Sequence, residues 1–174
     1  MSYFVENWVR GLEAASFRIN KEDPNFHPHI TIVRPFEPRS GEDEIKDTIV
    51  NCCKGRAPIT FCLVDKGNFD EVKYIPVISD DLSQFADELE NTLETSVDFA
   101  PKLGDERILH LRINSSEEID PFPRTESHML RLTVIRNKLI WFSYDFVTQE
   151  VLDREQSLDK DRWDKTVRLF HDKI

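Results

Sequence analysis

Cysteine is scarce in this sequence, and its placement excludes two kinds of stabilised fold. Only Cys52, Cys53 and Cys62 occur among the 174 residues. Adjacent cysteines do not readily bridge to each other, and a framework of structural disulfides needs more pairs. No CxxC spacing typical of a zinc site is present either. We therefore expect reduced thiols, no structural metal and no cofactor.

Long apolar runs are also missing. No stretch approaches the roughly 20 residues that a membrane-spanning helix needs. The first residues carry Glu6 and Arg10 among their apolar side chains, which is unlike a secretory signal peptide. These absences predict a soluble cytoplasmic protein that has no membrane partner.

Basic charge is under-represented. The chain has 33 Asp and Glu against 23 Lys and Arg, for a formal net charge of −10, and its pI is about 5.0. The field of such a molecule repels the phosphate backbone, so a long nucleic-acid duplex is a poor ligand. A small phosphoester, a nucleotide or an RNA end held in one local basic cleft stays compatible with this charge. The composition does not indicate an oligomeric state.

The sequence is nevertheless rich in core-forming residues. Hydrophobic residues make up 39%, including twelve Phe and three Trp, which indicates a folded globular protein. No low-complexity linker divides the chain. We expect one domain over residues 1–174, built as a single unit or as two closely packed halves.

The hydrophobic patterns predict an α+β fold with antiparallel strands and outer helices. Helices are predicted at 3–15 (its first residues helical or extended), from an acidic start at 40–44 through 50, from a cap at Asp80 or Asp81 through 93, and at 159–174. Strands are predicted at 29–33 (ended by Pro35 and Pro38), 59–64, 72–78 (near an edge because of Pro76), 108–113, 130–135, 139–146 and around 151. A turn is expected at 66–68, a loop at 99–104 and irregular chain at 115–127.

Two short histidine-bearing strands, about 80 residues apart, carry the functional signal. They are His29–Ile32 (HITI) and His110–Ile113 (HLRI). Side chains alternate along a strand, so His29 and Thr31 share one face, as do His110 and Arg112. Two such strands side by side would bring two titratable imidazoles to one phosphate-sized pocket, which suggests phosphoester chemistry.

These segments resemble those of the two-histidine phosphoesterase superfamily, which includes 2′-5′ RNA ligase-like proteins and cyclic phosphodiesterases. The PHITIVRPF segment at 28–36 is similar to the first family motif, and HLRI is similar to the second. FCLVDKGNF at 61–69 and VKYIPV at 72–77 are similar to the strand pair between them, followed by FAP at 99–101. The resemblance runs from about residue 26 to 146, so the predicted helix at 159–174 has no counterpart.

The resemblance implies a bilobal fold: two antiparallel sheets with outer helices, related by a pseudo-twofold axis around a central cleft. It also implies metal-free hydrolysis of a 2′,3′-cyclic phosphate, an RNA end or another small phosphoester. His29 and His110 would be the catalytic acid and base, in either order, and Thr31 would bind the phosphate. Arg112 replaces the threonine of the second motif and would bind phosphate with its guanidinium.

Other polar and aromatic residues are weaker candidates. Arg34 is predicted to be a rim charge that guides an anionic substrate, and Tyr144 or Trp141 to stack on a base. His27 belongs to a loop rather than to a metal site, because no third ligand has a suitable spacing. The alternative function is a non-catalytic nucleotide, RNA or phosphate-binding module on the same scaffold, in which Arg112 has replaced turnover with capture. A structural or regulatory interaction protein is the third hypothesis.

Overall fold

The computed structural model describes residues 3–8, 29–64, 74–102, 109–112 and 124–173. The expected turn at 66–68, the loop around His27 and most of the irregular segment at 115–127 lie outside these ranges. The ten strands of the described ranges are β1 (Tyr3–Trp8), β2 (His29–Pro38), β3 (Ile59–Leu63), β4 (Tyr74–Ile78), β5 (Val97–Phe99), β6 (His110–Arg112), β7 (Thr125–Met129), β8 (Arg131–Arg136), β9 (Leu139–Asp145) and β10 (Glu150–Asp153). Their helices are α1 (Glu42–Cys53), α2 (Asp80–Leu93), α3 (Arg154–Leu158) and α4 (Lys160–Asp172).

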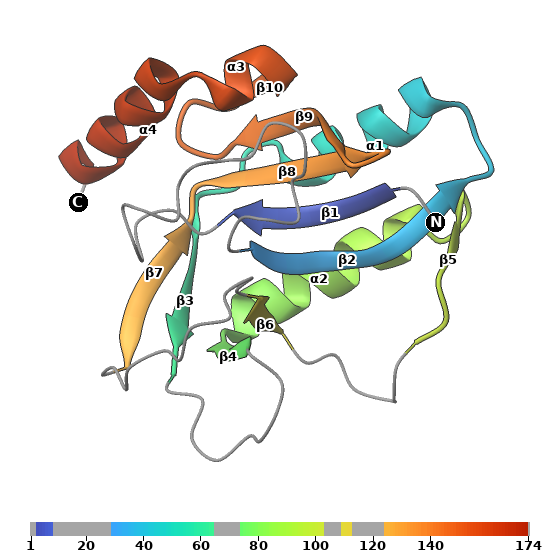
Figure 1. The fold of residues 1–174 in the computed structure, drawn as a ribbon, viewed down its shortest axis with the longest axis horizontal. Helices are drawn as coiled ribbons and strands as arrows, with labels where there is room; N and C mark the ends of the chain where they lie inside the picture. The colour runs from blue at the N-terminus through green and yellow to red at the C-terminus, as the bar shows by residue number, and fades with distance from the viewer. Residues whose placement is uncertain (1–2, 9–28, 65–73, 103–108, 113–123, 174) are drawn as a thin grey trace.

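All of these strands pair antiparallel, in the order β10-β9-β8-β1-β2-β6-β4-β3-β7, with β5 on the free part of β2. Only Leu130 separates β7 from β8 in the chain, although β7 ends this order and β8 stands near its other end. The sheet must therefore curl, as Figure 1 shows where β7 runs upward into β8. The α+β class with antiparallel strands is confirmed. The two expected sheets are joined into one hydrogen-bonded path through the β3–β4 pair.

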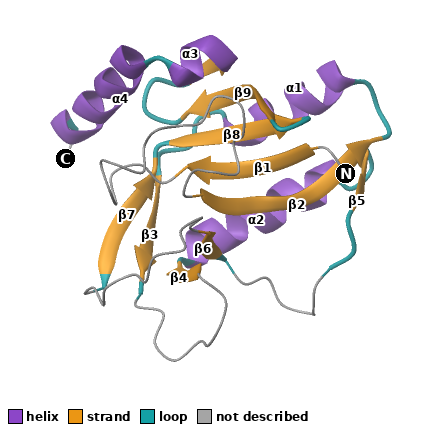
Figure 2. Ribbon diagram, viewed as in Figure 1, coloured by secondary structure: helices purple, strands orange, loops and turns teal. Residues whose placement is uncertain are grey.

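The two faces of this sheet are packed differently. On one face, which we call the core face, Ile30, Leu111, Leu132 and Val134 are fully buried. Helices α1 and α2 cover the core face with the apolar stripes Ile45–Ile49 and Leu82, Phe85, Leu89 and Leu93. Figure 2 shows both helices behind the strands, while α3 and α4 lie at the β8–β9–β10 end.

The first described segment, β1, is a strand, so the extended alternative holds for the first residues of the helix predicted over 3–15. Its apolar residues fit a helical stripe, but β1 fills the gap between β2 and β8 and pairs with both. Tertiary pairing therefore outweighs local periodicity here. Residues 9–15 of that predicted helix lie outside the described ranges.

Pro38 ends β2 as predicted, but Pro35 and Pro76 do not limit their strands. β2 runs on through Pro35 to Pro38. Pro35 is tolerated inside the strand because the β1–β2 ladder is interrupted there: the register shifts between the pairs Tyr3↔Phe36 and Val5↔Val33. Its carbonyl still accepts a hydrogen bond from Ala100 N at 2.8 Å. β4 is an interior strand between β6 and β3, and the Pro76 carbonyl accepts from Val64 N at 3.2 Å.

Several boundaries also differ from the prediction. Ser79, not an aspartate, caps α2, and its hydroxyl accepts from Leu82 N at 3.0 Å. The predicted loop is found at residues 100–102, after the short strand β5, whereas β7 takes the place of the end of the predicted irregular segment, and α3 precedes the predicted terminal helix. The helices at 42–53, 80–93 and 160–172, the hairpin β8–β9 and the strand β10 are confirmed. None of the helices in the described ranges is long and apolar enough to cross a membrane.

Candidate active site

Strands β2 and β6 bring the two histidine segments together. The two strands are antiparallel neighbours, with His29 opposite Arg112 and Ile30 opposite Leu111. Facing residues of an antiparallel ladder share a face, and so do residues two apart on one strand. His29, Thr31 and His110 therefore lie on one side of the sheet, with the backbone position of Arg112 among them. We call this side the histidine face.

The register of this pair is enforced by the opposite face. Ile30 and Leu111 face each other there, and both are fully buried in the core. A slip by one residue would bury the polar side chains under α2 and expose the aliphatic ones. The alternation of polar and apolar residues in HITI and HLR thus determines where both imidazoles lie.

The spacing of the two histidines suits one phosphoryl group between them. His29 and His110 occupy diagonal positions of the ladder, for which the Cα–Cα separation is about 7–8 Å. His29 is 4% exposed, and His110 is half-buried in the neighbouring strand. A substrate that reaches both imidazoles would thus approach from the more open His110 side.

Thr31 lies next to His29 on the same face and is half-buried. It stands opposite Glu6 of β1, and Glu6 stands opposite Thr133 of β8. Thr133 in turn faces Ser143 of β9, and their hydroxyl oxygens are 3.1 Å apart. The histidine face therefore continues as a row of polar positions from β2 across to β9.

Arg34 does not join the histidines. One terminal nitrogen of its guanidinium donates to the Ala100 carbonyl at 3.0 Å, and its Nε lies 3.9 Å from a Glu90 carboxylate oxygen on α2. The guanidinium also lies 4.7 Å from the centre of the Phe99 ring. These contacts tie β2 to the helix of the core face, so Arg34 braces the sheet rather than lining the candidate site.

Tyr144 is likewise separated from the histidines. It is 1% exposed and faces Leu132 on the core face. Its hydroxyl donates to Gln149 Oε1 at 2.7 Å, and burial raises the pKa of the phenol. Trp141 packs edge-on against Tyr3 and Phe142. The structure does not bring either predicted stacking residue to the histidine face.

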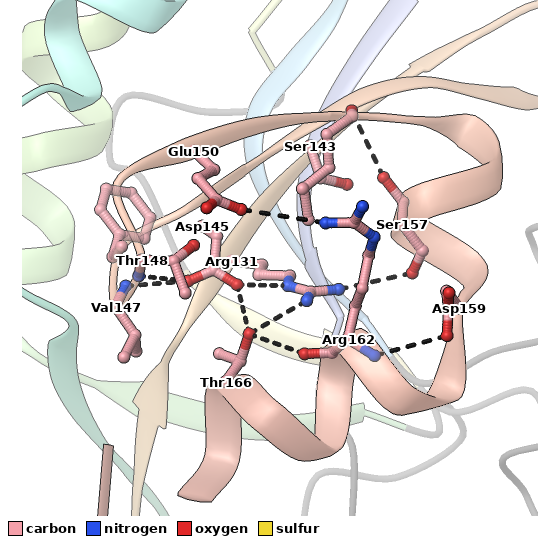
Figure 3. Close-up of polar contacts among 12 residues, drawn as sticks. Arg131, Ser143, Asp145, Val147, Thr148, Glu150, Ser157, Asp159, Arg162 and Thr166 are labelled. Carbon is pink, nitrogen blue, oxygen red and sulfur yellow. Dashed lines mark hydrogen bonds and ion pairs between the residues drawn. The ribbon is translucent and has the colours of Figure 1, made fainter. Parts of the chain in front are cut away.

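Sequence reasoning missed a buried polar cluster on the histidine face (Figure 3). Arg131 of β8 and Asp145 of β9 face each other, and Arg131 Nε donates to Asp145 Oδ2 at 2.7 Å. Thr166 of α4 donates to the same carboxylate oxygen at 2.5 Å. The sequence contained a sign of this ion pair: Arg131 lies near the start of one strand of the predicted hairpin, and Asp145 lies near the end of the other, where facing residues have opposite charge.

The described residues contain no group of three or more His, Cys, Asp or Glu side chains that could hold a metal ion. The three cysteines are free thiols, and burial raises the pKa of Cys53. An open pocket of about 360 Å³ lies between α2 and the start of β3, lined by Arg56, Thr60, Gln84 and Glu88 among others. It contains none of the candidate site residues.

Comparison with known proteins gives a family match. The family model described as the 2′-5′ RNA ligase superfamily matches residues 4–143, and so includes both histidine strands. No curated protein matches the sequence. A solved structure, that of TT0787 from Thermus thermophilus, is 17% identical, with a TM-score of 0.46 over 88% of this chain and 98% of that chain.

Proposed function

The chain belongs to the 2′-5′ RNA ligase superfamily, and on that premise we propose that it is a metal-independent phosphoesterase. Its substrate would be a 2′,3′-cyclic phosphate, an RNA end or another small phosphoester. One observation carries the proposal: His29 and His110 lie on adjacent strands, on one face, at diagonal ladder positions. Two histidines so placed suit in-line displacement at a phosphorus atom between them.

Each histidine would move one proton. The neutral imidazole of one takes a proton from the attacking water or hydroxyl as its oxygen bonds to phosphorus. The imidazolium of the other gives a proton to the leaving oxygen as the P–O bond breaks. Histidine is suited to both roles, because imidazole can accept or donate a proton under physiological conditions.

The negative charge on the phosphoryl oxygens in the transition state needs hydrogen-bond donors. The Thr31 hydroxyl would donate to one non-bridging oxygen, from the position next to His29. Arg112 would offer a planar pair of N–H donors from the position opposite His29. Donors fixed on strands are already oriented when charge develops, which is the main source of electrostatic stabilisation in such sites.

The first test is hydrolysis of nucleoside 2′,3′-cyclic phosphates in the presence of EDTA. We expect turnover in the wild type and a loss of about 10²–10⁴-fold in kcat for His29→Ala and for His110→Ala. His171→Ala is the matched control, because His171 is exposed in the last turn of α4. A full rate in either site variant would refute the assignment of acid and base.

The alternative is a binding module that holds the same ligands without turnover. The arginine at position 112 favours it, because a permanent charge that grips phosphate tightly also slows product release. The pH profile separates the two. Catalysis by two histidines gives a bell-shaped dependence of kcat/KM, with one limb for each group. A binding module gives no turnover at any pH, while its affinity for nucleoside phosphates remains measurable.

A further inference from the structure

The C-terminal helix pair, α3 and α4, lies on the histidine face. One row of facing positions crosses four neighbouring strands and so defines a common face for them. It consists of Thr31 on β2, Glu6 on β1, Thr133 on β8 and Ser143 on β9. Arg131 and Asp145 are on the same face, two residues along from Thr133 and Ser143. Both contact α4 through Thr166. The helices therefore cover the β8–β9 half of the face whose other half carries the histidines.

A buried ionic cluster holds α4 on the sheet (Figure 3). Arg131 donates to Asp145 at 2.7 Å, to Thr166 Oγ1 at 3.0 Å and to the Ser157 carbonyl at 3.5 Å. Its guanidinium also lies 5.2 Å from the centre of the Trp163 ring. Separating α4 from the sheet would leave the Arg131–Asp145 pair without these partners. Such a contact favours a fixed position for the helix over a moving one.

Further contacts fix both ends of the helix pair. Asp153 and Gln156 form a capping box at the start of α3, and the Asp159 carboxylate accepts from two backbone N–H groups of α4. Leu158 packs on a small apolar cluster formed by Ile135 and Ile140. Near the other end, the Phe170 ring packs against the His128 ring in a tilted arrangement, with 4.8 Å between ring centres.

The helix pair begins close to the candidate site. Only β1 stands between β2 and β8, and neighbouring strands are about 4.8 Å apart, so Thr31 and Thr133 are separated by about 10 Å. At this separation the helix pair would limit how far a substrate bound at Thr31 extends towards β8.

The helix pair carries mixed charge rather than a basic track, because residues 154–173 hold six Lys or Arg against five Asp or Glu. Lys160 donates to Asp164 at 2.7 Å, and Arg162 lies 4.0 Å from a Glu150 carboxylate. Single-strand binding proteins instead follow the backbone with basic side chains whose charge is available to phosphate.

We propose that the C-terminal helix pair is a specificity element that restricts the site to substrates of about one nucleotide on the β8 side. This inference rests on the proposed function and narrows its substrate class from phosphoesters in general to short ones. The helix pair lies beyond the residues that the family model matches. It lies outside the matched part of the chain and would select among substrates without taking part in proton transfer.

The test compares a nucleoside 2′,3′-cyclic monophosphate with an oligoribonucleotide that ends in the same cyclic phosphate. We expect the wild type to favour the mononucleotide by about tenfold or more in kcat/KM, the scale of a steric discrimination. Thr166→Val removes the hydroxyl that joins α4 to Asp145, and we expect it to reduce this preference by about threefold or more. Trp163→Ala is the second variant and acts on the same surface.

Thr48→Val is the matched control, because Thr48 is also a helical threonine, half-buried on α1, and its hydroxyl donates to the Glu44 carbonyl of its own helix. We expect it to leave the preference unchanged. Equal kcat/KM for both substrates in the wild type would overturn the inference while the phosphoesterase stands. So would an unchanged preference in both folded α4 variants.

A binding measurement keeps the inference separate from the reaction. Titration calorimetry would compare a nucleoside 2′-monophosphate with an oligoribonucleotide that carries the same terminal 2′-phosphate. If the protein hydrolyses neither cyclic substrate, the proposed function fails, and the ratio of the two dissociation constants still decides the inference. Weaker oligonucleotide binding that improves in Thr166→Val supports it. Equal binding, or binding of neither ligand, overturns it.

Discussion

Replacing Arg131 with methionine is expected to destabilise the fold strongly, because Arg131 is half of a buried ion pair. The side chains of Arg131 and Asp145 are 7% and 1% exposed. Methionine keeps the unbranched stem but removes the charge and every hydrogen bond to Asp145, Thr166 and Ser157. The carboxylate then stays buried with no positive partner, its remaining donors being Thr166 and the backbone N–H groups of Val147 and Thr148.

Breaking a buried pair by removing one partner costs about 3–5 kcal/mol. For a chain of this size each kcal/mol corresponds to about 2–4 °C, so we expect Tm to fall by roughly 6–20 °C. Arg136→Met is a matched control on the same strand. Like Arg131, Arg136 forms an ion pair, here with Glu42, and its guanidinium lies over a tryptophan ring, here that of Trp141. Its pair is 35% and 47% exposed, so the cost there is about 0–1 kcal/mol.

Urea unfolding followed by tryptophan fluorescence and circular dichroism measures both variants on one scale. The midpoint reports the stability change, and an unchanged m-value shows that the exposed area on unfolding is the same. Equal destabilisation by the two variants would refute the reasoning, because burial is the property that distinguishes the two pairs. A separate early transition in Arg131→Met, seen by one probe only, would mean that the C-terminal helix pair unfolds before the sheet.

Two further predictions concern local contacts. Ser79→Ala removes the N-cap of α2 and a hydrogen bond to the Thr60 carbonyl, and urea unfolding is expected to show a loss of about 0.5–2 kcal/mol; no loss would mean that Asp80 or Asp81 replaces the cap. Burial and the hydrogen bond to Glu42 raise the pKa of Tyr3 to about 12. Because the folded-state pKa is raised, the phenol's contribution to stability is present below pH 10 and is lost as pH rises towards 12. Spectrophotometric titration of the tyrosines tests the raised pKa of Tyr3. If Tyr3→Phe shows every high-pH ionisation that the wild type shows, Tyr3 is not the residue with the raised pKa.

The sequence predicted the elements whose patterns are local. The stripe of Leu82, Phe85 and Leu89 indicates a helix without any knowledge of the sheet, and the structure confirms it. The hairpin β8–β9 was predictable for the same reason, since Asn137 and Lys138 at its turn adopt positive φ between two apolar strands. The polar and apolar alternation of β2 and β6 predicted a shared face, and their pairing satisfies that expectation.

Features that depend on distant partners were not predictable in this way. β1 has a sequence that suits a helix, and only its position between β2 and β8 makes it a strand. Tyr144 was a reasonable stacking residue until the register of β9 placed it on the core face beneath α1 and α2. Arg34 lies beyond a register shift in β2, so alternation counted from Thr31 could not give its contacts. Thr166 joins Asp145 only because α4 folds back across the sheet.

The substitution of arginine for threonine at position 112 is the point at which the enzyme and the binding module diverge. Arg112 stands opposite His29 in the ladder, next to the proposed phosphate position. If its guanidinium binds phosphate, Arg112→Thr loses charge-assisted hydrogen bonds worth about 1.5–3 kcal/mol. KM for a cyclic mononucleotide would then rise about ten- to a hundredfold, with a smaller change in kcat. Arg112→Lys restores the charge without the planar pair of donors and is expected to recover part of the affinity.

Arg124→Thr is the control for charge alone, because Arg124 is exposed before β7. The opposite result for Arg112→Thr, a gain in kcat from a slow wild type, would mean that arginine retains the ligand and limits turnover. That outcome would favour the binding module, since the restored threonine motif would then be the more active form. The sign of the change in kcat therefore separates the two functions in one variant, while the histidine pair and the sheet that orients it remain the same.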